Sequence, residues 1–397
     1  SMDSLSSAFY AALSAVGFAY SLRIFLPFIP IVPTAILVTL AFTVLHLFGV
    51  SKVGGAQMIL GGVLLVLLGI YVVAGLVQPQ GFNWERFVPG GKFFIYDTIG
   101  ANIAMILSTM ALIFNAFVGF ELIADDAEEV SNPNRTIPIA LLGSLAAITI
   151  IYAVVTLVTL GTAPWTELAG SETALTQAVT RFLPGVGPAL IGIAGIIATL
   201  TSINTAMLSA TREAMTLSRL GLWPKAMARL GRLRTPYVSI IFIGAVVGLT
   251  SALGVVTLLG YISSSGYLFV MFWSGLAMLR LHRLHPNVER PFRAPLFPLT
   301  AYVQVGVCVV VLAFTAPAAL AFGGGVLLLL TVVYYVREPL SEQMAERKLA
   351  TANGHHRILV TIANPNTAAG LVDLAASLSE RCLLYTSPSP RDRTRSR

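Results

Sequence analysis

The sequence predicts an all-α integral membrane protein that crosses the bilayer about ten times. Apolar residues make up 56% of its 397 residues and charged residues only 11%, whereas a soluble domain has about 25% charged residues. Its charge-free runs are long enough for the ~20 apolar residues that a membrane-spanning helix needs. These runs are continuous rather than alternating, which favours helices over a β-barrel.

Eight charge-free runs predict the spanning helices. The first six fit one crossing each, although the first has little room for a complete helix. The last two are about twice too long for one crossing. They are interrupted at Ser251–Gly254 and Thr315–Pro317, so each is expected to form a helical hairpin. The runs are Ser4–Leu22, Ile24–Ser51, Val53–Trp84, Thr98–Phe120, Thr136–Thr166, Phe182–Thr211, Thr235–Leu279 and Ala294–Val336.

Positive charge gathers in loops that share one side when ten crossings are threaded alternately. The segment Arg212–Arg234 holds six Lys or Arg residues and Arg280–Arg293 holds four, whereas the opposite loops carry only Arg86, Lys92 and Arg181. Short cytoplasmic loops are enriched in Lys and Arg, so the basic side and the C-terminal tail are expected to be cytoplasmic. The net charge of +7 therefore reflects topology and does not indicate a nucleic-acid partner.

The sequence has no pattern of metal or nucleophile chemistry. Its two cysteines, Cys308 in an apolar run and Cys382 in the tail, imply no disulfide framework. No His or Cys pair has metal-ligand spacing, and no serine lies in the strand–turn–helix context of a nucleophile. We therefore expect no catalytic residue, no metal, no cofactor and no enzyme activity.

The predicted membrane domain covers residues 1–338, and three segments of different composition follow it. Residues 339–356 are interpreted as a cytoplasmic linker. Residues 357–381 combine a β-rich run, an Asn-Pro-Asn turn and a helical repeat, and they resemble the truncated start of a universal-stress-protein domain. Residues 382–397, CLLYTSPSPRDRTRSR, match the translation of a common sequencing-library adapter and are interpreted as an artefact.

The densest acidic cluster lies in FNAFVGFELIADDAEEVSNPNRTIP, residues 114–138. Glu121 ends an apolar run, and a charge at membrane depth costs about 2.5–3.5 kcal/mol, so it is expected to face protein or a water-filled cavity. The acids after it lie at a helix C-terminus, where the macrodipole disfavours them. We expect them to pair with Arg135 or with Arg212–Arg234, and a solvated acidic loop is the alternative. These acids are Asp125, Asp126, Glu128 and Glu129.

Asn115 and Gly119 lie four residues apart inside the apolar run before Glu121. Glycine weakens a helix by about 1 kcal/mol relative to alanine. In transporters with inverted repeats, an interrupted helix at mid-membrane exposes backbone groups to the substrate. Close packing of two helices at a small residue is the alternative interpretation.

Two separated motifs resemble the amino acid–polyamine–organocation (APC) permeases. The FVGFE, AEE, NP and R–IP elements of residues 114–138 resemble the signature of the sixth family helix. The stretch TLTSINTAMLSATREAMTLSRLGLWPKAMARLGRLRTP, Thr199–Pro236, is similar to the eighth helix and its following loop. The resemblance covers roughly Ser4–Val336 and implies a twelve-helix fold with two inverted five-helix repeats. Aligned this way, the chain holds family helices three to twelve and is expected to lack the first two.

The resemblance also implies a substrate site. The sixth family helix is expected to unwind between Asn115 and Phe120, with the break at Gly119, and Glu121 becomes a gating or proton-sensing acid. Many relatives carry an aromatic gate where this chain has Asn115, which leaves the substrate preference open. The patch Tyr261–Gly266 either lines the pore or packs helices. The implied substrate-binding residues are Asn115, Phe117, Gly119, Phe120 and Ser264.

Coupling to an ion is implied less specifically. The hydroxyls of Thr201, Ser202 and Thr205 lie near the region that holds sodium in sodium-coupled relatives, although such hydroxyls commonly bond to their own helix instead. The run Val53–Val77 lacks the lysine that some proton-coupled relatives use. For His46, an interfacial role is favoured over proton relay. H+, Na+ and a counter-substrate all stay open.

The expected function is that of a secondary active transporter that moves an amino acid or related amine by alternating access. The alternative is a channel-like or sensory membrane protein regulated through its cytoplasmic tail, for which the sequence offers no ring of charge or filter-like loop. The expected partners are the substrate and the lipid bilayer of a prokaryotic cell membrane. The sequence does not indicate whether the protein is a monomer or an oligomer.

Overall fold

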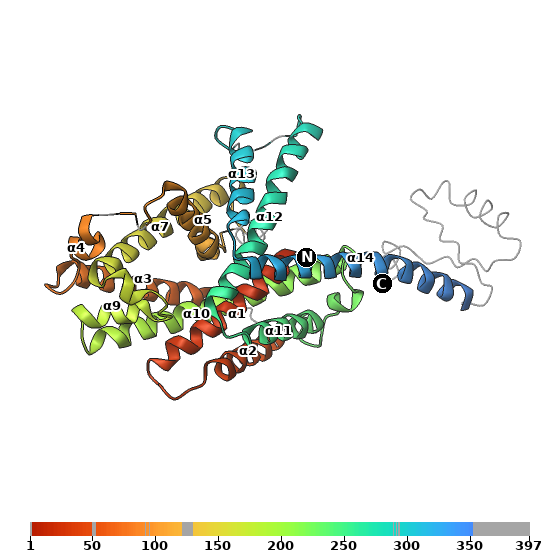
Figure 1. Cartoon of the computed structure of the whole chain (residues 1–397). Helices are drawn as coiled ribbons and strands as arrows, with labels where there is room; N and C mark the ends of the chain where they lie inside the picture. The colour runs from red at the N-terminus through yellow and green to blue at the C-terminus, as the bar shows by residue number, and fades with distance from the viewer. Residues whose placement is uncertain are drawn as a thin grey trace, which may run out of the picture. The chain divides into compact units, whose positions relative to one another are not determined.

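The computed structural model describes residues 2–49, 53–91, 93–94, 96–120, 130–288, 290, 292 and 294–351, without the side chains of 53–56 and 336–351. The chain divides into two compact units, residues 1–328 and residues 329–397. Within the described residues every regular element is a helix (Figure 1). The predicted stress-protein-like fragment, residues 357–381, and the tail, residues 382–397, lie outside the described residues.

The helices follow the predicted runs in order. The long ones are α1 (Met2–Arg23), α2 (Ile31–Phe48), α3 (Val53–Val77), α5 (Ile99–Ile113), α7 (Pro133–Thr162), α10 (Val186–Arg219), α11 (Tyr237–Ser251), α12 (Val256–Leu284), α13 (Leu299–Ala313) and α14 (Pro317–Thr351). The short ones, in the connections, are α4 (Trp84–Phe87), η1 (Pro89–Gly91), η2 (Phe114–Phe117), α8 (Trp165–Leu168), α9 (Ala174–Phe182) and η4 (Lys225–Ala228).

The described residues contain eight helices long and apolar enough to span a membrane, and two shorter apolar helices, α11 and α13. Each expected hairpin is interrupted where the sequence indicated, between α11 and α12 and between α13 and α14. The first run differs from expectation, because α1 is a full 22-residue helix rather than an incomplete one. It gains length from Met2 and Asp3 at its start and Arg23 at its end, since a helix can include charges at its ends. The number of crossings, about ten, stays a prediction.

Helix α1 forms the centre of the first unit. It packs against α2, α10, α11 and α12, and 61% of its apolar window is buried, compared with 44% or less in the other candidate spans. Ala8, Ala11, Ala12 and Ala15 are fully buried in the core cluster that α1 shares with α10 and α11. Small side chains let helix backbones approach closely, which is how helices associate in lipid. Figure 1 shows α1 beside α10.

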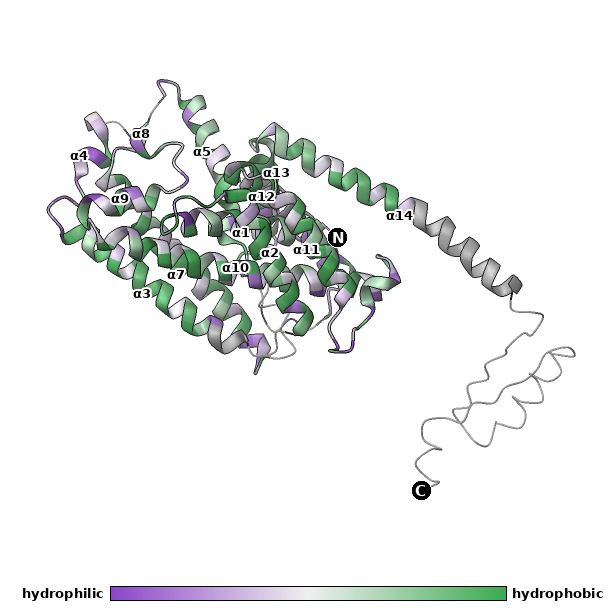
Figure 2. Ribbon diagram, turned by 90° about the horizontal axis from the view of Figure 1, so that it is seen from below, coloured by the Kyte–Doolittle hydropathy of each residue, from purple (hydrophilic) through white to green (hydrophobic). Residues whose placement is uncertain are grey.

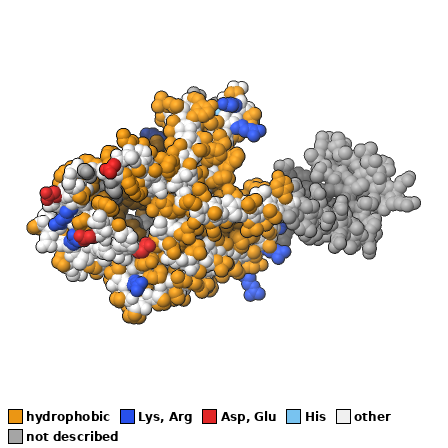
Figure 3. Space-filling model, viewed as in Figure 1, with side chains coloured by type: hydrophobic (Ala, Val, Ile, Leu, Met, Phe, Trp, Pro, Cys, Tyr) orange, Lys and Arg blue, Asp and Glu red, His pale blue; other side chains and the backbone are white. Residues whose placement is uncertain are grey.

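The outer helices keep large apolar side chains on the surface. Met58 and Val66 on α3 are 77% and 62% exposed, and Leu142 on α7 is 59% exposed. Figure 2 shows hydrophobic residues along much of these helices, and in Figure 3 the charged side chains form only a few scattered groups on a mostly hydrophobic face. An apolar surface of this extent indicates contact with lipid rather than water.

Gly244 marks a place where two of these helices touch. A methyl group added there would clash with the hydroxyl oxygen of Thr43 on α2, and the β-branched Thr43 is stiff in a helix. We predict that Gly244→Ala destabilises the protein by about 1–3 kcal/mol through overpacking, measured as a lower melting temperature in detergent. Gly248→Ala, one turn further along α11 and facing open space, is the matched control. Equal melting temperatures for the two variants would contradict this packing.

Candidate functional site

The helix that carries the predicted break ends well before its apolar run does. α5 stops at Ile113, and a 3-10 turn from Phe114 to Phe117 follows. Val118 is extended, with φ −69° and ψ 146°, and Gly119 has φ +118°. Residues with a side chain rarely adopt that φ, so glycine suits this position. The backbone is therefore non-helical at Gly119, where the family resemblance implied unwinding.

Side chains from α12 and α7 hold this break. The hydroxyl of Ser264 on α12 accepts a hydrogen bond from the backbone N–H of Asn115 at 3.1 Å and donates to the carbonyl of Leu112 at 3.2 Å. Tyr152 on α7 donates to the carbonyl of Ala116 at 2.9 Å, and its ring packs edge-on against Phe117. Backbone groups that leave helical bonding inside a membrane protein need such partners. The break is thus a stabilised feature of the fold.

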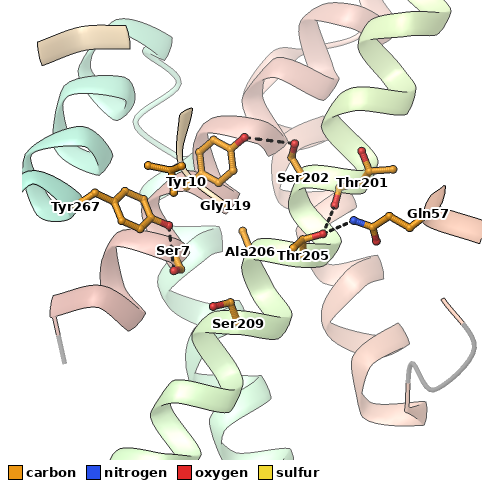
Figure 4. Close-up of a pocket in the computed structure, with 11 residues that line it drawn as sticks. Ser7, Tyr10, Gln57, Gly119, Thr201, Ser202, Thr205, Ala206, Ser209 and Tyr267 are labelled. Carbon is orange, nitrogen blue, oxygen red and sulfur yellow. Dashed lines mark hydrogen bonds between the residues drawn. The ribbon is translucent and has the colours of Figure 1, made fainter. Parts of the chain in front are cut away.

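A cavity of about 180 Å³ lies against the break. It is lined from α1, α3, α10 and α12, and by Val118 and Gly119 of the break; Figure 4 shows Gly119 among the lining residues of these helices. None of the described lining residues is charged, and most carry a hydroxyl or an amide. The lining residues are Ser7, Tyr10, Gln57, Val118, Gly119, Thr201, Ser202, Thr205, Ala206, Ser209 and Tyr267.

Hydrogen bonds between helices fix the polar groups of this cavity. Tyr10 on α1 donates to Ser202 on α10 at 3.4 Å, and Tyr267 on α12 donates to Ser7 on α1 at 3.0 Å. On α10, Thr201 and Thr205 donate to carbonyls of their own helix. Their hydroxyl protons are therefore directed at the backbone, and their oxygens can still accept or coordinate.

A chain of buried and half-buried polar side chains leads from the cavity into the bundle. The Gln57 amide donates to the Thr205 hydroxyl, and Asn204 on α10 donates to the Gln57 carbonyl oxygen at 3.3 Å. The Nε2 atom of His46 on α2 lies 3.1 Å from the side-chain carbonyl oxygen of Asn204. The sequence favoured an interfacial role for His46, but its side chain is only 3% exposed. Tertiary packing therefore decides its environment, because α2 turns this face toward α10.

The structure brings some predicted site residues together and separates others. Four of them line the cavity: Gly119, Thr201, Ser202 and Thr205. Asn115, Phe117 and Ser264 lie at the break instead and are not among the described lining residues, and neither is Phe120. Glu121 and the acids Asp125, Asp126, Glu128 and Glu129 lie outside the described residues. The roles assigned to all these residues stay predictions.

Five polar residues of the cavity were missed: Ser7, Tyr10, Gln57, Ser209 and Tyr267. A signal existed for two of them. Gln57 is the only amide side chain in α3, and Ser7 belongs to a cluster of serines at the start of α1. The tyrosines gave no signal, because amphipathic aromatic rings are common in membrane helices. Among the described residues no group of three or more His, Cys, Asp or Glu is arranged to hold a metal ion.

Comparison with known families adds to this description of apolar helices, one of which ends in a break. A family model described as amino acid permease matches residues 4–368. The chain belongs to this family. Its members and named relatives are permeases and transporters rather than enzymes, and the apolar helices of this family member are those of a multi-pass membrane protein.

Three relatives illustrate the similarity. The branched-chain amino acid permease BcaP of Bacillus subtilis is 27% identical over 281 residues, 69% of this chain and 57% of that protein. The methylthioribose transporter of Bacillus subtilis is 28% identical over 249 residues, 62% of this chain and 50% of that protein. The gamma-aminobutyric acid permease of Escherichia coli is 26% identical over 300 residues, 72% of this chain and 64% of that protein. The chain spans about half the length of the first two.

The polar chain of Gln57, Asn204 and His46 generates a stability prediction. Asn204→Leu keeps the approximate volume but removes the partner of both the His46 Nε2 atom and the Gln57 carbonyl oxygen. Each buried polar group left without a partner costs about 1–3 kcal/mol, so the melting temperature in detergent should fall clearly. Thr250→Val, which removes a hydroxyl that bonds only to its own helix, is the control and should change little. An unchanged melting temperature for Asn204→Leu would show that the chain contributes nothing to stability.

Proposed function

We propose that this protein is a secondary active transporter that carries an uncharged-side-chain amino acid across the cell membrane by alternating access, with the cavity beside Gly119 as its substrate site. The observation that carries the proposal is the coincidence of a helix break with a polar, uncharged cavity in a chain of the amino acid permease family. Backbone groups at a helix break provide partial charges for a zwitterion without a buried ionised side chain.

The chemistry of the lining favours this substrate class. Hydroxyls and an amide can hydrogen-bond the ammonium and carboxylate groups of an amino acid. A cationic or acidic substrate side chain would need an opposite charge in a site of low dielectric, and none of the described lining residues supplies one. A relative named for branched-chain amino acids agrees with an apolar substrate side chain.

The proposal also includes the driving force that is coupled to amino acid transport. Thr201, Ser202 and Thr205 keep oxygen atoms at the cavity, which suits a sodium ion, and Glu121 is the proposed gating or proton-sensing acid. The predicted cytoplasmic side, with the tail, is the side of the basic loops. A proton gradient, a sodium gradient and preloaded counter-substrate are the three driving forces to compare.

Uptake into proteoliposomes tests the transport proposal. The purified protein should accumulate leucine or valine with saturation, and unlabelled neutral amino acids should compete while lysine and glutamate should not. Imposing each gradient in turn identifies the coupling. Ion conductance without saturable amino acid uptake would instead support the channel-like alternative and refute the transporter.

Gly119 provides the sharpest variant. Its φ of +118° is strained for any residue with a Cβ, although a Cβ there meets none of the described residues, so Gly119→Ala should reshape the break without clashing with them. We predict at least about a tenfold loss of initial uptake rate, equivalent to about 1.4 kcal/mol of activation free energy, with expression unchanged. Gly90→Ala, in a connection that does not line the cavity and also at a positive φ, is the matched control. Full uptake by Gly119→Ala would rule out a required glycine break.

A further inference from the structure

A second cavity, of about 240 Å³, lies at the other end of the polar chain. It is formed by the end of α2, the last turns of α10 and the segment that leads into α11. Its lining includes Arg212, Arg219 and Arg234, and none of its described lining residues is acidic. These arginines belong to the basic segment that the sequence predicts on the cytoplasmic side.

Orientation of the protein in the membrane explains why basic residues lie on this side, but it does not explain the buried polar residues of the cavity, which we call its floor. The arginines form its rim. His46 and Thr211 both line it and are each 3% exposed. The Nδ1 atom of His46 and the hydroxyl oxygen of Thr211 are buried and have no hydrogen-bond partner among the residues that the structure describes. Buried polar atoms are nearly always bonded, so two unbonded ones at one basic cavity indicate a ligand.

The hydrogen bonds around His46 define what its free atom can do. The Asn204 carbonyl oxygen can only accept, so the Nε2 atom of His46, 3.1 Å away, must carry the hydrogen. Asn204 is held in this orientation because its own amide nitrogen donates to Gln57. In the neutral ring, Nδ1 then keeps a lone pair that no described group binds, on a side chain that lines the cavity. The floor therefore offers one hydrogen-bond acceptor and one hydroxyl.

The rim offers the complementary groups. Arginine guanidinium groups donate several hydrogen bonds to an oxyanion in a fixed geometry. Arg219 and Arg234 are exposed and line the cavity. Arg212 also lines it but already interacts with another group of the chain. The site is therefore argued from Arg219 and Arg234. A ligand that satisfies both rim and floor must be an oxyanion that carries a proton of its own.

We propose that this cavity is a binding site for hydrogen phosphate, with Arg219 and Arg234 holding the anion and the bare Nδ1 of His46 accepting its P–OH hydrogen. Inorganic phosphate keeps at least one such hydrogen near neutral pH. Sulfate and the phosphodiester of a lipid headgroup have the charge but not the hydrogen. The site is therefore expected to prefer phosphate to sulfate, which a merely basic surface would not do. It lies apart from the proposed amino acid site and does not depend on it.

Isothermal titration of the purified protein in detergent with inorganic phosphate and with sulfate, at about pH 8, tests the proposal. Phosphate should bind at least about tenfold more tightly than sulfate. Arg219→Gln combined with Arg234→Gln should weaken phosphate binding by about tenfold or more, because two charge-assisted contacts are lost. Arg229→Gln combined with Arg232→Gln is the matched control, since these exposed arginines of the same segment do not line the cavity.

His46→Leu should abolish the preference of phosphate over sulfate while leaving the arginines in place. If that variant does not fold, the two arginine pairs still decide the outcome. Equal affinities of the wild-type protein for phosphate and sulfate, or no binding of either, would overturn the proposal. Binding that emerges only when Asp125, Asp126, Glu128 and Glu129 are neutralised would also overturn it, by showing that the chain's own carboxylates occupy the cavity.

A further experiment tests whether the cavity binds the phosphate of a lipid headgroup rather than inorganic phosphate. The protein is placed in nanodiscs of phosphatidylcholine with or without phosphatidylglycerol, and its melting temperature is measured. The proposal expects no stabilisation by phosphatidylglycerol that depends on Arg219 and Arg234. Such a stabilisation, without any effect of inorganic phosphate, would assign the cavity to a lipid headgroup and refute a hydrogen phosphate site.

Discussion

The structure depends on one constraint: polar groups inside a bundle that faces lipid must find partners within the bundle. Hydrocarbon offers no hydrogen bond, so an unpaired polar group there is costly. The described helices satisfy this by bonding across their interfaces, as in Ser4 to the carbonyl of Ala210 at 2.8 Å between α1 and α10. Tyr71 on α3 and Thr159 on α7 bond in the same way at 2.8 Å. These pairs, with small residues at close contacts, set how the helices dock.

The break after α5 obeys the same constraint. Ending a helix inside an apolar run frees N–H and carbonyl groups, and Ser264 and Tyr152 bind three of them. Asn115, Phe117 and Ser264, which the family resemblance implied as substrate contacts, lie where they support this geometry. Support of the break and contact with a substrate are different tasks, and a change at these residues is expected to act on the site through the backbone.

Helix α10 links the two cavities. Thr205 lines the uncharged cavity and Thr211 the basic one, fewer than two turns apart on the same helix. Asn204 joins Gln57 on one side to His46 on the other, so the hydrogen bonds run continuously from one cavity to the other. A rearrangement of α2 or α3 against α10 has to break these bonds. Such a set of discrete bonds is the kind of element through which two sites can influence each other.

The family resemblance, rather than a local pattern, implied the interruption near Gly119, because a glycine in an apolar run also fits close helix packing. The sequence by itself determined the helical class and the positions of most helices, because charge-free length and turn residues are local properties. It also indicated the hydroxyl-bearing part of α10, since Thr201, Ser202 and Thr205 are close in the chain. The cavity as a whole needed the tertiary structure. Tyr10 meets Ser202 across 192 positions and Tyr267 meets Ser7 across 260, and no local pattern encodes such pairs. The burial of His46 likewise followed from which face of α2 meets α10, because helix propensity fixes a helix but not its partner.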